Sequence, residues 1–173
     1  MSFFIIQVQT RKEEEFLNFD RKKNINTEAS LFLPRRKLRI RRKGKWIESI
    51  SPIFPGYIFL KSDSVPYDIY KTIKNFPGFI RFLNNNHNIT PLVGTDKAII
   101  NHFINFGEIV GKSFVCFDVN KKVQVISGPL KGLEGTIIKV DKRKRRIKVK
   151  LHFYKNLYPI DFSFEVVKNE KKE

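Results

Sequence analysis

The sequence predicts an α+β protein in which a mixed α/β domain is followed by a small five-stranded β-barrel. Two patterns lead to this prediction. Up to about residue 107, short runs of β-branched and aromatic residues alternate with stretches of helical spacing, whereas beyond residue 120 only strand patterns follow. A length of 173 residues suits one or two domains, and a hydrophobic content of 41% can supply their cores.

The first domain is predicted to contain strands and helices in the order β-α-β-β-α-β-α. The strands are expected at residues 3–9, 31–40 with a break at Pro34, 53–60 and 79–83, and the helices at residues 11–19, 65–75 and 96–106. Thr10 and Glu13 have the spacing of a capping box at the start of the first helix. This order of elements is typical of a ferredoxin-like α/β sandwich.

The second domain is predicted from a strand at residues 145–153 that alternates strictly between apolar and cationic residues. Its apolar residues are Ile147, Val149, Leu151 and Phe153, and its polar residues are Arg146, Lys148, Lys150 and His152. One face is therefore expected in a core and the other toward solvent or a ligand. Further strands are expected at residues 123–126, 135–140, 157–160 and 164–167. A closed barrel would remove the unpaired edges of so few strands.

The predicted domain limits are residues 1–107 and 121–173, with a linker at residues 108–120. Phe114, Val115 and Phe117 make the middle of this linker unusually apolar. Two interpretations remain open at this point, a flexible joint and a segment that packs on one domain or forms a short strand.

The net charge of +17, from 34 Lys and Arg against 17 Asp and Glu, favours a polyanionic partner, most often nucleic acid. A general basic bias or a role in solubility is the alternative. The single cysteine, Cys116, excludes an intramolecular disulfide and fits a reducing cytosol. No apolar run approaches the roughly 20 residues that span a bilayer. The start of the chain lacks the basic region of a secretory signal, so we expect a cytoplasmic protein without membrane association.

The sequence contains no pattern that predicts catalysis. His87, His102 and His152 fall in different predicted elements without ligand spacing, and Cys116 is alone. The turn at residues 128–132 is too short for a phosphate-binding P-loop. We therefore expect neither an enzyme nor a metal site, and no cofactor.

Four segments resemble the NusG family in their order and spacing. They are FFIIQVQ (3–9), FPGYIFL (54–60), NFPGFIRFL (75–83) and KVQVISGPLKGLEGTIIKVD (122–141), and the last resembles the KOW motif of small β-barrels. A narrower resemblance is to specialised NusG paralogues, the LoaP antiterminators. It rests on KGKW (43–46), GPLKG (128–132) and the very basic second domain, because a housekeeping NusG is usually near neutral or acidic.

The resemblance implies that an apolar depression on the first domain binds the clamp helices of RNA polymerase. The matching positions are Phe54, Pro55, Gly56, Tyr57, Phe59, Phe79 and Phe82. Two large rings held by a rigid Pro-Gly turn would suit an amphipathic helical partner. The alternative is that the rings are core, and strand alternation places at least half of them there. We expect Tyr57 and Phe54 to make the contact.

Two basic segments are the candidate nucleic-acid contacts. The first is a predicted hairpin tip with Arg35, Arg36, Lys37, Arg39, Arg41, Arg42, Lys43, Lys45 and Trp46; in the family the corresponding face lies near upstream DNA and the non-template strand. The second comprises Lys142, Arg143, Lys144, Arg145, Arg146, Lys148 and Lys150, expected to bind a hairpin of nascent leader RNA. The alternatives are solvated charges at both segments and, for the second, a face for a ribosomal protein.

The leading functional hypothesis is a monomeric antitermination factor that binds RNA polymerase through its first domain and RNA through its second. The alternative is a general NusG elongation factor whose KOW domain contacts the ribosome or Rho. A ribosome-associated KOW protein is a third reading, which the NusG-like first half disfavours.

Overall fold

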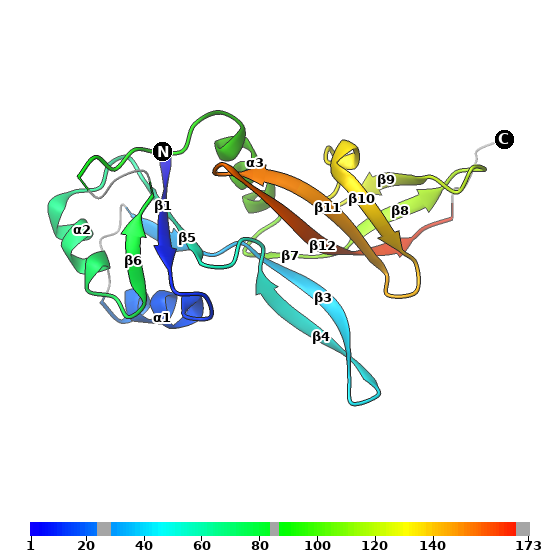
Figure 1. Cartoon of the computed structure of the whole chain (residues 1–173), viewed down its shortest axis with the longest axis horizontal. Helices are drawn as coiled ribbons and strands as arrows, with labels where there is room; N and C mark the ends of the chain where they lie inside the picture. The colour runs from blue at the N-terminus through cyan, green and yellow to red at the C-terminus, as the bar shows by residue number, and fades with distance from the viewer. Residues whose placement is uncertain (24–28, 84–86, 169–173) are drawn as a thin grey trace. The chain divides into compact units, whose positions relative to one another are not determined.

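The computed structural model describes residues 1–23, 29–83 and 87–168 (Figure 1). The chain divides into two compact units, Met1–Leu33 with Phe54–Ala98 and Pro34–Ile53 with Ile99–Glu173. The α+β class predicted from the sequence is confirmed. The units do not follow the predicted limits, because residues 34–53 lie with the C-terminal part of the chain. Within the described residues, every helix is too short or too polar to cross a membrane.

The first unit is built on a four-stranded sheet in the order β2-β5-β1-β6. Its strands are β1 (Ser2–Val8), β2 (Ser30–Phe32), β5 (Tyr57–Ser62) and β6 (Phe79–Phe82), and all three ladders are antiparallel. Helices α1 (Glu13–Lys23) and α2 (Tyr67–Lys74) contribute Phe16, Leu17, Ile69 and Ile73 to a core that includes Ile6 and Ile58 of the central strands. The apolar residues at helical spacing thus cover one face of the sheet.

The predicted capping box of α1 does not form, and Glu13 contacts the turn at residues 54–57 instead. Arg11 has a φ of 76°, so the helix begins only at Glu13. The buried Glu13 carboxylate accepts a hydrogen bond of 2.7 Å from the backbone N–H of Gly56. Glu13 therefore holds the Phe-Pro-Gly-Tyr turn, because a buried carboxylate needs donors to offset its lost hydration.

The second unit contains two sheets. Strands β3 (Arg35–Arg42) and β4 (Lys45–Pro52) form an antiparallel hairpin, which the short β7 (Ile109–Val110) extends in parallel. A five-stranded sheet has the order β10-β11-β12-β8-β9. Its strands are β8 (Ser113–Phe117), β9 (Val123–Ser127), β10 (Ile137–Asp141), β11 (Arg146–Phe153) and β12 (Asn156–Val166), and the 3₁₀ turn η1 spans Glu134–Thr136. Residues of α3 (Gly94–Ile104) pack on this sheet, where the rings of Phe103 and Phe162 stack at 5.5 Å.

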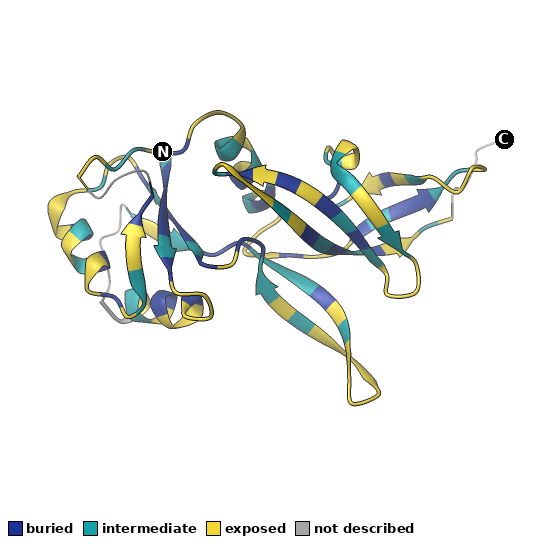
Figure 2. Cartoon of the chain, in the orientation of Figure 1, coloured by how far each residue is buried: buried dark blue, intermediate teal, exposed yellow. Residues whose placement is uncertain are grey.

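The alternation predicted along β11 is confirmed, and buried and exposed residues follow one another along it in Figure 2. Ile147, Val149, Leu151 and Phe153 are all buried. Of the two interpretations of residues 108–120, strand formation is confirmed, because the segment contains β7 and β8. The prediction of two strands at 157–160 and 164–167 is wrong, since these residues belong to the single strand β12. The five strands have β10 and β9 at the ends of their order, which is consistent with the predicted KOW β-barrel, although no ladder joins β10 to β9 within the described residues.

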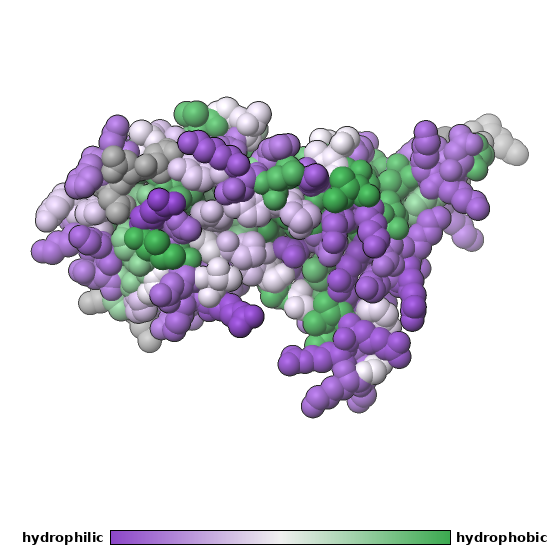
Figure 3. Space-filling model, viewed as in Figure 1, coloured by the Kyte–Doolittle hydropathy of each residue, from purple (hydrophilic) through white to green (hydrophobic). Residues whose placement is uncertain are grey.

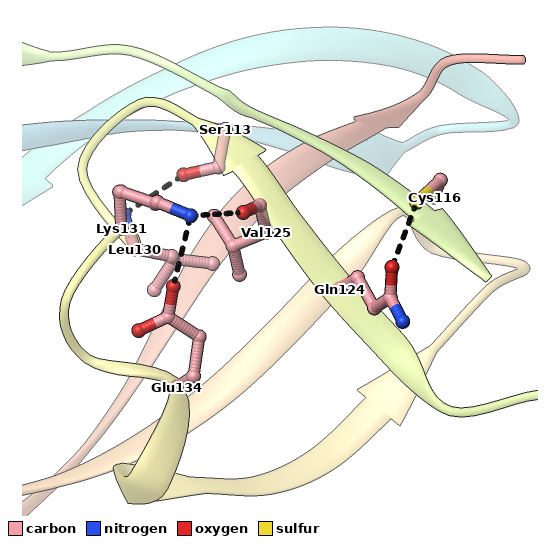
Figure 4. A network of polar contacts seen from close by, with 7 residues as sticks. All are labelled: Ser113, Cys116, Gln124, Val125, Leu130, Lys131 and Glu134. Carbon is pink, nitrogen blue, oxygen red and sulfur yellow. Dashed lines mark hydrogen bonds and ion pairs between the residues drawn. The ribbon is translucent and has the colours of Figure 1, made fainter. Parts of the chain in front are cut away.

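The turn at residues 128–132 is fastened to the sheet by its own backbone and one lysine (Figure 4). Ser113 Oγ accepts from the N–H of Leu130 at 2.9 Å, and Lys131 Nζ donates to the Val125 carbonyl at 3.0 Å. Gly128 has a φ of 95°, and a Cβ there would lie 2.7 Å from the Cα of Ser113. Only glycine fits this close approach of two strands.

Candidate functional site

The outer end of the β3–β4 hairpin is a cationic tip with one indole ring. Lys43 and Gly44 form the two-residue turn with φ values of 47° and 77°, as a tight hairpin turn requires. Arg41 lies opposite Trp46 in the ladder, and the Arg39 guanidinium lies 4.9 Å from the centroid of the Trp46 ring. Hydrophilic residues cover this end of the hairpin (Figure 3).

The tip residues remain exposed, as the sequence predicted. They are Arg39, Arg41, Arg42, Lys43, Lys45 and Trp46. No acidic residue occurs between residues 35 and 47. The tip can therefore offer several cations and a stacking surface to a phosphate backbone and an unpaired base.

The inner end of the hairpin uses its cations as anchors. Arg35 Nη2 lies 3.2 Å from Glu108 Oε2, and Arg36 Nη1 donates to the Pro52 carbonyl at 2.7 Å. Burial lowers the pKa of Arg36, and the charge of Arg146 lowers it further while Asp161 opposes both. Lys37 pairs with Glu48 at 3.2 Å. Arg35, Arg36 and Lys37 are half-buried and have internal partners, so their predicted contact with nucleic acid stays a prediction.

The hairpin is tied to the outward face of the five-stranded sheet. Arg146 Nη2 donates to the Arg39 carbonyl at 2.8 Å, and Ser163 Oγ donates to the Lys37 carbonyl at 2.9 Å. Lys148 Nζ lies 3.9 Å from Asp161. Strand β3 thus covers part of the face that the sequence assigned to solvent or ligand. Arg146 and Lys148 are half-buried for this reason, while Lys150 remains exposed.

A second exposed cationic segment is the β10–β11 turn. Asp141 Oδ1 accepts from the N–H of Lys144 at 2.9 Å, and this hydrogen bond is the largest cause of the lowered pKa of Asp141. Lys142 Nζ lies 3.9 Å from the centroid of the Phe117 ring. Arg143, Lys144 and Arg145 are exposed. The turn is therefore held in one conformation by an aspartate while its cations face outward.

A groove of about 760 Å³, here called the hairpin groove, lies within the second unit. It is lined by Lys37, Leu38, Arg39, Glu48, Ile50, Ile109, Gly111, Lys112, Arg145, Ser163, Phe164, Glu165 and Val166. Sequence reasoning missed Ile50, Ile109, Lys112 and Val166 as site residues. The groove is formed by segments far apart in the chain, and the sequence signal that could have found it, the apolar residues of 108–120, was interpreted as a linker.

In the first unit, the aromatic residues predicted to bind a partner differ in burial. Phe54, Phe59 and Phe82 are each 0% exposed, so they are core and not contact residues. Phe59 stacks on Phe32 at 5.4 Å, and Phe82 lies 5.7 Å from the ring of Tyr70. Their burial is the expected result for large rings on central strands.

The other positions predicted to contact polymerase differ in their exposure to solvent. Pro55 is exposed, Tyr57 and Phe79 are half-buried, and Gly56 is buried with a φ of 82°. Both backbone polar groups of Gly56 are used, since its carbonyl accepts from Val8 N–H at 2.9 Å and its N–H donates to Glu13. The turn that presents Pro55 and Tyr57 is therefore rigidly held.

Comparison with protein families gives two matches. A family described as "Transcription termination factor nusG" matches residues 1–101, and the KOW motif matches residues 119–151. The first match alone covers more than half of the chain.

Two relatives and one solved structure extend these matches. The transcription termination/antitermination protein NusG of Rickettsia prowazekii is 30% identical over 129 residues, which are 73% of this chain and 66% of that protein, so the match falls just short of two thirds of the relative's length. The protein of the same name from Thermus thermophilus is 24% identical over 139 residues, 75% of this chain and 74% of that protein. The structure titled "Domain interaction in Thermotoga maritima NusG" is similar in fold, with a TM-score of 0.60 and 19% identity over 94% of this chain and 93% of that chain.

Proposed function

This chain belongs to the NusG family of transcription termination factors, and from that premise we propose that it is a specialised antitermination factor that binds RNA polymerase through its first unit and nucleic acid through its second. The predicted NusG and KOW segments are confirmed by the family matches. Members of the family are transcription factors, which also confirms the prediction that the chain is not an enzyme. The LoaP-like specialisation is part of the proposal.

The observation that carries the nucleic-acid part is the pair of exposed cationic segments in the second unit. The hairpin tip offers Arg41, Arg42 and Lys43, and the β10–β11 turn offers Arg143 and Lys144. The hairpin tip has no acidic residue in its turn. The β10–β11 turn has Asp141, whose carboxylate accepts hydrogen bonds from backbone N–H groups. Exposed, uncompensated cations of this density suit the phosphates of nascent RNA, and of upstream or non-template DNA at the hairpin.

The polymerase part depends on the turn at residues 54–57. Pro55 and Tyr57 stand on a backbone fixed by Glu13, so the first unit presents one ring without ordering a loop on binding. Such pre-organisation favours docking of a helical partner. Ile80, 48% exposed, offers additional apolar surface.

A general NusG elongation factor is the second candidate function. It is favoured by the names of the relatives, which are transcription termination/antitermination proteins of the NusG type. In that case the second unit would contact the ribosome or Rho, and its cations would serve solubility or a protein partner.

A termination assay with purified RNA polymerase separates the two candidates. The specialised factor should increase read-through only on templates that encode one leader element, whereas equal effects on all templates would support the general factor.

The nucleic-acid contact is tested by changing Arg41, Arg42 and Lys43 together to alanine in the full chain. We expect RNA affinity to fall about tenfold or more, and the slope of log K against log salt to fall by about 2. The matched control changes Lys61, Lys71 and Lys74 of the first unit, which lie outside both cationic segments. Equal losses in the two triple variants would mean that net charge alone governs binding, and the site would be wrong.

A further inference from the structure

The hairpin groove is lined by apolar residues and by cations, and the charged lining residues are here called its rim. Ile50, Ile109 and Val166 are 48%, 37% and 43% exposed, although each is a large aliphatic residue. They converge on one groove with Lys37, Arg39, Lys112 and Arg145 around them. Exposed apolar side chains scattered singly need no explanation, but three that line one concave surface mark a binding site.

The charges of the rim are only half compensated. Lys37 pairs with Glu48 at 3.2 Å, and Lys112 forms an ion pair with Glu165, whose pKa is lowered chiefly by that hydrogen bond. Glu165 also interacts with the charge of Arg145, and Glu48 lies opposite Arg39 in the β3–β4 ladder, so four lining cations share two lining carboxylates. The Arg39 guanidinium lies over the Trp46 ring, 4.9 Å from its centroid, and a guanidinium held in this way can donate its in-plane N–H groups to a phosphate.

The groove is continuous in the chain with both exposed cationic segments. Arg39 leads along β3 to the hairpin tip, and Arg145 is the last residue before β11 and follows directly on the β10–β11 turn. A ligand that passes from the groove along either of these segments would meet further exposed cations. A nucleic-acid strand meets this requirement, since its phosphates repeat along its length while its bases present flat apolar faces.

We propose that the hairpin groove binds about one or two unpaired nucleotides of a single strand. The base faces lie on Ile50, Ile109 and Val166, and the phosphates lie against Arg39 and Arg145. A duplex does not offer its base faces in this way, so the groove selects single-stranded segments. This inference rests on the proposed function, in that nucleic acid is taken as the ligand of the second unit. It adds that the groove recognises the unpaired nucleotides of that ligand.

The test uses the full chain with three labelled probes, which are a single-stranded oligouridine of twelve nucleotides, a blunt twelve-base-pair DNA duplex, and an acidic peptide that carries leucines. Fluorescence anisotropy measures each affinity for the unchanged chain, for Ile50→Glu, and for Ile138→Glu. Ile138 is a matched control because it is an exposed isoleucine of a strand in the same unit, 53% exposed, and it is not a lining residue of the groove. Both variants add one carboxylate, so they differ only in its position.

We expect Ile50→Glu to weaken oligouridine binding about tenfold and to change duplex binding less than about twofold. Ile138→Glu should change both affinities less than about twofold. Circular dichroism verifies folding, and Ile109→Glu replaces the first variant if that one is unfolded.

Three outcomes would overturn the inference. Equal affinities of Ile50→Glu and Ile138→Glu for oligouridine would remove the groove from the binding surface while leaving the proposed function intact. The same would follow if Ile50→Glu abolished peptide binding alone, which would make the groove a protein site. Failure of the unchanged chain to bind either nucleic acid would overturn the proposed function itself, and the inference with it.

Discussion

Strand β3 begins and ends with a pair of arginines whose environments are opposite. Arg35 and Arg36 at its start are half-buried and bonded to Glu108 and the Pro52 carbonyl, whereas Arg41 and Arg42 at its end are exposed near a tight turn. The residue type is the same, and the difference lies in what covers each end. Close to the five-stranded sheet a guanidinium replaces its lost hydration with carbonyls and carboxylates, while at the tip it keeps its hydration and can exchange it for phosphate.

This contrast assigns stability to the inner cations and binding to the outer ones. The same division is present in the first unit, where Phe59 is buried and Tyr57 is half-buried on one strand. Paired substitutions test both contrasts.

The largest effect is expected for Phe59→Ala. Removal of a fully buried ring that packs on Phe32 and Phe54 should lower the free energy of unfolding by about 3–5 kcal/mol. Tyr57→Ala should cost about 1 kcal/mol or less, because the side chain is half-buried, and should weaken polymerase binding while RNA binding is retained. Urea denaturation and pull-down with purified polymerase measure the two effects. If Phe59→Ala were the milder change, the assignment of core and surface would be reversed.

Asp161→Ala should lower the free energy of unfolding by about 2 kcal/mol. The aspartate pairs with Lys148 at 3.9 Å and counteracts the mutual repulsion of Arg36 and Arg146, so its removal leaves like charges together in a partly buried place. Urea denaturation again gives the value. The double variant Asp161→Ala with Arg146→Met should recover part of the loss, and the absence of recovery would show that charge repulsion is not the cause.

The two ends of β3 are compared directly by Arg36→Ala and Arg42→Ala. The inner change should cost about 1–2 kcal/mol, since it removes a hydrogen bond to the Pro52 carbonyl and a buried aliphatic stem. The outer change should stay within about 0.5 kcal/mol and reduce RNA affinity instead. Equal stability losses would refute the division between anchor and ligand-binding cations.

The smallest effect concerns pH at the β10–β11 turn. The pKa of Asp141 is lowered by the N–H of Lys144, so its contribution to stability is complete above the ordinary pKa of 3.8 and is lost as pH falls through the lower value in the folded protein. Acidification should therefore loosen the turn, which is measured by hydrogen exchange at Lys144. Asp141→Asn should show no such pH dependence, and an unchanged profile in that variant would exclude Asp141 as the titrating group.

The parts of the fold that sequence predicted are those fixed by local patterns. The alternation of Ile147 and Val149 determines the buried face of β11 whatever its neighbours are. Strand β8 pairs with the neighbouring β9 and, in parallel, with β12 some fifty residues later, where Ser113 pairs with Phe164. The apolar residues Phe114 and Val115 left a strand and a joint open as interpretations, and no local pattern in residues 108–120 indicates the distant partner.

The exposure of the candidate site residues was predictable where a local turn keeps the side chains in water. It was not predictable where burial depends on packing against other elements. Arg41 and Lys43 are exposed at a tight turn, where Arg41 Nε donates only to the Gly44 carbonyl at 3.3 Å among the contacts of the described residues, and the sequence shows both the turn and the charges. Whether Phe54 faces a core or a partner depends on what covers it, and its sequence neighbours are the same in either case. The inner residues Arg36 and Lys37 belong to the second class, because their partners come from β4.

The division of the chain into interleaved units has a consequence during protein synthesis. Residues 34–53 are made before the residues whose side chains fasten them, Arg146 and Ser163. On the ribosome the β3–β4 hairpin thus emerges with its two strands able to pair but with no sheet beneath it. The inner arginines Arg35 and Arg36, half-buried in the finished fold, are not yet covered by that sheet, and docking of the hairpin waits for β11 and β12.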